Sequence, residues 1–145
     1  MNVQRITTPE DLDAALAIRN TVFVQGQNVP AELENDAHDR TDATHYLART
    51  DDGTPCGAAR WRPTENGVKL ERFAVLGQFR NQQVGAALLA SVLHDVQAAH
   101  PEATVYLNAQ LPAVRFYERH GFEKVGEQFT EAGIEHYKMQ WKRPA

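Results

Sequence analysis

The sequence predicts a single α+β domain in which a mixed, mostly antiparallel sheet is flanked by helices. Short strands separated by turn-rich segments dominate the first half of the chain. An amphipathic helix over residues 84–96 then separates two apolar strands, at 68–76 and 103–108, which favours one parallel crossover within the sheet. The chain has 145 residues, the size of one domain, so residues 1–145 are expected to form one unit.

Turn and capping residues divide the first half of the chain into separate elements. Thr8 and Pro9 begin a helix as its N-cap and first-turn residues, followed by acidic residues at the positive end of its dipole. A short helical turn is expected in the acidic loop from Ala31 to Asp36. Strands are expected at residues 3–6, 45–49, 56–62 and 68–76, with turn residues between them. The last three of these strands follow one another and are expected to form a meander.

The second half alternates helices and strands. In the helix over residues 84–96 the large apolar side chains share one face, which predicts that this face is buried. Pro112 suits the first turn of a further helix, and Gly121 suits the left-handed residue after the end of that helix. Residues 122–145 are expected to hold two strands around a turn at 131–133.

Composition and charge exclude several classes of protein. The net charge is −4 with both signs interspersed, which is not the pattern of a nucleic-acid-binding protein. A single cysteine and the lack of a charged leader followed by an apolar run predict a cytoplasmic protein. Every apolar stretch is too short to span a membrane. The six histidines show no pair at metal-ligand spacing, so no metal site is expected.

An anion-binding turn is predicted at residues 80–86. The strand at 68–76 runs into a turn rich in glycine and amide side chains, and this turn opens directly into the next helix. The first amides of a helix have no intrahelical partner and lie at the positive end of its dipole, so the turn can hold a phosphate. Arg80 adds a permanent positive charge. The alternative is an ordinary strand-to-helix turn in which Gly85 allows close packing.

A second motif, Tyr-x-x-x-Gly-Phe at residues 117–122, follows on the next helix. Together the two motifs resemble the GNAT superfamily of acyl-CoA-dependent N-acetyltransferases, whose phosphate loop reads Q/R-x-x-G-x-G/A. Gln83 stands where the first glycine of that loop is expected. The chain resembles the ElaA-like branch of the superfamily and, more distantly, glyphosate N-acetyltransferase. The similar segments cover most of the chain, at residues 22–30, 80–86, 106–110, 117–122 and 129–139.

The resemblance implies a GNAT-type fold and direct transfer of an acetyl group from acetyl-CoA to a primary amine of a small molecule. It implies that the strand before the loop parts from its neighbour at a bulge, so that its amides bind the pantetheine and polarise the acyl oxygen. Tyr117 would protonate the leaving thiolate, with a packed core aromatic as the alternative. The implied acetyl-CoA site comprises Phe73, Ala74, Val75, Arg80, Asn81, Gln82, Gln83, Val84, Gly85, Ala86, Asn108 and Tyr117.

His136 is the candidate for the base that takes the amine proton. Strand alternation places it on the face opposite Tyr137 and Met139, and imidazole suits proton abstraction near neutral pH. The resemblance to the ElaA-like branch implies the same role. Many GNAT members use a glutamate at the position of Lys69, so Glu71, two residues further on, or a water relay is an open alternative, as is a structural role for His136.

The same resemblance directs Arg19 and Arg72 toward the acceptor, where guanidinium groups would select a carboxylate or phosphonate. Gln110 shares a strand face with Asn108, and both could hydrogen-bond the acceptor or the pantetheine amides. Surface salt bridges are the alternative for both arginines. Two rival functions stay open from the sequence: a catalytically silent acyl-CoA-binding module, and an acetyltransferase that acts on protein lysines. A homodimer is an open assembly, and neither nucleic acid nor membrane is an expected partner.

Overall fold

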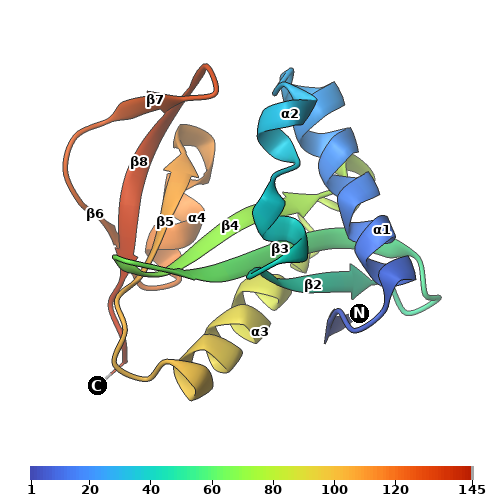
Figure 1. Cartoon of the computed structure of the whole chain (residues 1–145), viewed down its shortest axis with the longest axis horizontal. Coiled ribbons are helices and arrows are strands. Elements are labelled where there is room, and N and C mark those ends of the chain that lie inside the picture. The colour runs from blue at the N-terminus through green and yellow to red at the C-terminus, as the bar shows by residue number, and fades with distance from the viewer. Residues whose placement is uncertain (145) are drawn as a thin grey trace.

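In the computed structural model, which describes residues 1–144, eight strands form one mixed sheet (Figure 1). The strand order is β1-β2-β3-β4-β5-β8-β6, and β7 pairs with β8 beside this path. All pairings are antiparallel except that of β4 with β5. The strands are β1 (Asn2–Arg5), β2 (Thr44–Arg49), β3 (Pro55–Thr64), β4 (Gly67–Val75), β5 (Val105–Gln110), β6 (Phe122–Lys124), β7 (Phe129–Glu131) and β8 (Ile134–Trp141).

Helices cover the sheet on both sides. The helical elements are α1 (Pro9–Arg19), η1 (Asn20–Gln25), α2 (Ala31–Glu34), η2 (Ala37–Arg40), η3 (Gly77–Phe79), α3 (Val84–Ala99), η4 (Leu111–Ala113) and α4 (Val114–Arg119). In β2, Tyr46 belongs to the core cluster of α3 and Leu47 to that of α1. Because successive strand residues point to opposite faces, α3 and α1 pack on opposite faces of the sheet. Figure 1 shows these two helices on either side of β3.

The predicted fold class is confirmed, and most of the expected elements are present. Thr8 caps α1 by accepting a hydrogen bond from the Asp11 amide at 3.2 Å. The crossover through α3 joins two parallel strands, and Gly121 adopts a φ of 89° after α4. The features that were not predicted include the π-helix η1, the 3-10 helices η2 and η3, the short strand β6, and a start of β5 two residues later than expected. Within residues 1–144 no helix is both long and apolar enough to cross a membrane.

The two parallel strands separate along their length. β4 pairs with β5 only from Val68 to Leu70, opposite residues 105–107. Immediately beyond, β4 carries a bulge, since Arg72 and Phe73 together oppose the single residue Ala59 of β3. Arg72 has a left-handed φ of 58° at this bulge. From there to Val75 the outer edge of β4 has no strand partner within the described chain, so an opening forms beside β5.

Candidate active site

The opening between β4 and β5 is a cleft of about 640 Å³. We call its two sides the N-terminal wall and the C-terminal wall. The N-terminal wall comprises Val22, Phe23, Gln27, Val29, Leu33, Glu34, residues 69–75 and Arg80. The C-terminal wall comprises residues 107–110, Ala113, Tyr117, Glu131, Ala132, Ile134 and His136. The expected strand residues Phe73, Ala74 and Val75 and the expected Asn108, Gln110, Tyr117 and His136 therefore share one cavity.

The turn at residues 80–86 has the backbone geometry of an anion-binding loop. The first hydrogen bond of α3 runs from the Ala87 amide to the Gln83 carbonyl at 3.0 Å, so the amides of residues 84–86 lack intrahelical partners. Gln83 adopts a left-handed φ of 68°, which explains why glycine is favoured at this position. Its side chain is exposed rather than packed into the turn. The substitution therefore keeps the backbone path and leaves the amides accessible.

Tyr117 lies at the C-terminal wall with its ring in an aromatic cluster. The ring makes edge-to-face contacts with Phe73 of β4, at 6.3 Å between centroids, and with Phe116 and Phe122. Only 8% of the residue is exposed. Burial raises the pKa of its hydroxyl, so the hydroxyl is protonated at neutral pH. Tyr117 thus has the packed ring of a core aromatic residue, and it is also a protonated residue that lines the cleft.

His136 presents one ring nitrogen as a proton acceptor. Its Nδ1 lies 2.7 Å from the carbonyl oxygen of Ile134. A carbonyl can only accept, so Nδ1 carries the proton and Nε2 holds the lone pair in the neutral ring. Nε2 lies 3.9 Å from the carboxylate of Glu131, and the ring stacks on Phe129. The hydrogen bond to Ile134 thus fixes the tautomer of a residue that lines the cleft.

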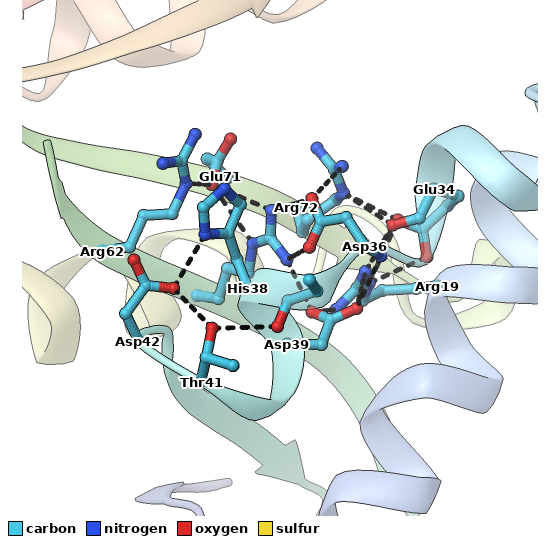
Figure 2. A network of polar contacts seen from close by, with 12 residues as sticks. Arg19, Glu34, Asp36, His38, Asp39, Thr41, Asp42, Arg62, Glu71 and Arg72 are labelled. Carbon is cyan, nitrogen blue, oxygen red and sulfur yellow. Dashed lines mark hydrogen bonds and ion pairs between the residues drawn. The ribbon is translucent and has the colours of Figure 1, made fainter.

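A network of buried ion pairs joins the acidic loop after α1 to the sheet (Figure 2). Arg60 of β3 is fully buried and pairs with Asp39 at 2.6 Å and with Asp36 at 2.8 Å. Arg19 of α1 pairs with Asp39 at 2.7 Å and makes several hydrogen bonds to Glu34. Although burial opposes it, the two arginines lower the pKa of Asp39. The network holds α2 and η2 against the sheet beside the N-terminal wall.

This network includes Arg19 and Arg72, which the family resemblance directed toward the acceptor. Arg19 is 1% exposed and lies outside the cleft lining, contrary to the expectation that it contacts an acceptor. Its guanidinium instead forms ion pairs with the buried carboxylates of Glu34 and Asp39. Arg72 does line the cleft, but its guanidinium pairs with Glu34 at 2.8 Å and with Asp36 at 3.3 Å. Neither arginine therefore presents an uncommitted positive charge to the cleft.

Glu71 is a poor alternative to His136 as the base. Its carboxylate is bound by Arg60 at 3.0 Å, Arg62 at 2.7 Å and Lys69 at 3.2 Å. Burial alone would raise the pKa of Glu71, but the hydrogen bond from Arg62 and the neighbouring charges outweigh it and lower the pKa to about 2. A carboxylate with so low a proton affinity does not take a proton from an amine near neutral pH.

Among the cleft residues that were not identified from the sequence, Gln27 and Glu131 make polar contacts with predicted site residues. Gln27 and Gln110 exchange two side-chain hydrogen bonds, although they are separated by 83 positions in the chain. Glu131 places its carboxylate beside His136 from the turn between β7 and β8. The segment containing Gln27 belongs to the family resemblance, but no local pattern distinguishes this glutamine from Gln25 beside it. Glu131 could have been found from the predicted turn, which brings it next to the His136 strand.

Comparisons with known proteins agree with this architecture. The family described as "Acetyltransferase (GNAT) domain" matches residues 7–143. The uncharacterized N-acetyltransferase YjcF of Bacillus subtilis is 38% identical over 131 residues, which cover 90% of this chain and 91% of YjcF. Protein ElaA of Escherichia coli is 33% identical over 131 residues, which cover 88% of this chain and 85% of ElaA.

Solved structures show the same fold. The crystal structure of Escherichia coli ElaA matches with a TM-score of 0.88 and 30% identity, covering 98% of this chain and 100% of that chain. An aminoglycoside 6'-N-acetyltransferase complexed with coenzyme A matches with a TM-score of 0.75 and 16% identity, over 100% of both chains. The parted parallel strands, the loop before α3 and the match over nearly the whole sequence lead to one conclusion. The chain belongs to the GNAT acetyltransferase family and is ElaA-like.

Proposed function

We propose that the protein transfers an acetyl group directly from acetyl-CoA to the primary amine of a small molecule. One observation carries the proposal: a single cleft brings the open edge of β4 together with Tyr117 and His136, and the loop at residues 80–86 begins beside it. Coenzyme A in the complex of the aminoglycoside 6'-N-acetyltransferase, which shares the fold, supports acetyl-CoA as the donor. The pyrophosphate would bind the loop amides and Arg80, and the pantetheine the edge of β4 at residues 73–75.

In the proposed reaction, the N-terminal wall stabilises the oxyanion and the C-terminal wall transfers the protons. The amine nitrogen attacks the thioester carbonyl, and the backbone edge at residues 73–75 stabilises the oxyanion. Nε2 of His136 takes the proton that the amine loses, and Glu131 stabilises the imidazolium that forms. The carbon–sulfur bond then breaks, and Tyr117 donates its proton to the thiolate. An apolar surrounding disfavours the phenolate as well as the thiolate, so burial keeps Tyr117 protonated until the carbon–sulfur bond breaks but does not by itself drive the proton transfer.

A screen of amines with acetyl-CoA, monitored by thiol release, tests the function. Release that depends on a small primary amine supports the proposal. Binding of acetyl-CoA without release for any amine would instead indicate the silent acyl-CoA-binding module. Release with lysine peptides alone would indicate a protein acetyltransferase. Purified protein with His136 and Tyr117 both replaced serves as the blank for spontaneous thioester hydrolysis.

Replacing Gly85 with glutamate is expected to weaken coenzyme A binding at least about tenfold, because it adds a negative charge to the turn that would hold the phosphates. A Cβ at residue 85 would lie 3.5 Å from the ring of Phe116, an ordinary contact. The variant Gly85→Ala therefore fits and serves as the matched control with nearly unchanged affinity. Isothermal titration calorimetry with coenzyme A measures both. Equal affinity for Gly85→Glu and the parent would contradict the assignment of the loop.

Replacing His136 with alanine is expected to abolish the rise of kcat/KM with pH that a neutral imidazole base produces. The affinity for coenzyme A should stay nearly unchanged, because the loop at residues 80–86 is not altered. Initial rates across a pH series, with calorimetry on the same preparations, measure both effects. If kcat/KM of His136→Ala still rises with pH as in the parent, the amine loses its proton through a water relay or in solution, and the role of His136 is structural.

A further inference from the structure

The Gln27–Gln110 bridge is a reciprocal pair of hydrogen bonds between the two walls of the cleft. Nε2 of Gln27 lies 3.1 Å from Oε1 of Gln110, and Nε2 of Gln110 lies 2.9 Å from Oε1 of Gln27. Both side chains are half-buried, and both line the cleft. Gln27 stands on the N-terminal wall and Gln110 ends β5 on the C-terminal wall.

The bridge lies at the open end of the cleft, beside the base. Gln110 pairs in register with His136, so the two side chains are cross-strand neighbours. In the chain from residue 1 to residue 144, one side-chain hydrogen bond joins β3 or β4 directly to β5, between Thr64 and Tyr106 at 2.7 Å. That contact lies at the closed end, where β4 and β5 still pair. Within residues 1–144, the glutamine pair therefore makes the only side-chain hydrogen bonds across the cleft where the strands have separated, in addition to the ring contact of Phe73 with Tyr117.

The backbone that carries Gln27 is held independently of the bridge. Asn28 adopts a left-handed φ of 57°, and the Val29 amide donates to the Phe23 carbonyl at 3.0 Å, which closes the turn after η1. On the far side of this turn, Glu34 is fixed by the buried ion pairs with Arg19 and Arg72. The turn is thus anchored at both ends. Opening the bridge requires rotation of two side chains and no movement of the wall.

We propose that the Gln27–Gln110 bridge determines specificity, favouring a small, slender amine over a lysine held in a polypeptide. This inference rests on the proposed function and names the acceptor class of the same site. Each amide in the bridge keeps one N–H and one lone pair unused, so a small polar amine can bind beside the intact bridge. The residues that flank a lysine in a peptide need the space that the bridge crosses. A peptide must therefore bind the open form.

The size of the discrimination follows from the strength of the bridge. Two half-buried amide hydrogen bonds, less the side-chain entropy lost in forming them, leave a closed form favoured on the order of tenfold. A ligand that binds only the open form loses affinity by the same factor, whereas a ligand that tolerates both forms loses nothing. The bridge therefore favours binding of the small amine over binding of the peptide by a factor on the order of ten.

Calorimetry on protein saturated with coenzyme A tests the inference. The ligands are butylamine and a capped pentapeptide with one central lysine. In Gln27→Ala the ratio of the peptide Kd to the butylamine Kd should fall about tenfold. Gln110→Ala should produce the same fall, and the double variant no further fall, because both changes break one bridge. Gln25→Ala, an exposed glutamine at the end of η1, is the matched control and should leave the ratio unchanged.

A charge-paired variant distinguishes the bridge from a general loosening of the wall. Gln27→Glu combined with Gln110→Lys restores a contact across the cleft and should restore the parental ratio. The inference is overturned by an unchanged ratio in Gln27→Ala, by additive effects in the double variant, or by the failure of the parent to bind either ligand. Thiol release is measured separately. Its absence would overturn the proposed transfer, while the binding ratio still decides the role of the bridge.

Discussion

Replacing Tyr117 with phenylalanine is expected to lower kcat by roughly 10²- to 10⁴-fold, the range for loss of a general acid. The ring and its contacts with Phe73 and Phe122 are kept, so the fold and the affinity for acetyl-CoA should change little. Burial raises the pKa of this hydroxyl, and the protonated form is therefore present throughout the working pH range. Steady-state kinetics with saturating acetyl-CoA measures the effect once an acceptor is found.

The matched control is Tyr106→Phe. Tyr106 is also a buried tyrosine, but its hydroxyl bonds to Thr64 at the closed end of the cleft and does not line the cavity. Its replacement should leave kcat within a few-fold of the parent. Near-full kcat in Tyr117→Phe would remove Tyr117 from the reaction and return it to the aromatic core. Equal losses in both variants would point to packing rather than proton transfer.

Replacing Arg60 with methionine is expected to lower the free energy of unfolding by about 3–5 kcal/mol, the range for removing one partner of a buried ion pair. Arg60 is 0% exposed and neutralises Asp36, Asp39 and Glu71 in the folded protein. Methionine fills much of the volume but leaves these carboxylates short of a positive charge. Urea unfolding followed by circular dichroism measures the change as a lower midpoint.

A partly exposed ion pair provides the control for this second prediction. Arg49 pairs with Asp11 at 2.6 Å, with side chains 31% and 26% exposed. Its replacement by methionine should cost no more than about 1 kcal/mol, because water competes for both charges. If Arg60→Met costs as little as Arg49→Met, the network does not hold the acidic loop in place. The loop would then be anchored by its apolar contacts.

Local pattern was sufficient for the features that depend on neighbouring residues in the chain. The order of most strands and helices follows from periodicity and turn residues, and the prediction of an anion-binding turn at residues 80–86 rests on a strand that is followed by a helix. Strand parity placed His136 on the cleft face, because side chains alternate strictly along a strand. Even Gln83, where the family has glycine, keeps the left-handed backbone of the turn.

The sequence by itself determined the fold class and singled out the turn at residues 80–86 and the two candidate proton carriers, whereas tertiary structure decided how the charges and amides are used. Arg19 and Glu71 are compatible with functional roles until carboxylates and guanidiniums from distant segments meet them in the interior. The Gln27–Gln110 bridge joins residues separated by 83 positions. Each of these outcomes depends on which polar groups are buried together, because a polar group shielded from water must pair with a neighbour. The sequence around a single residue does not specify that neighbour.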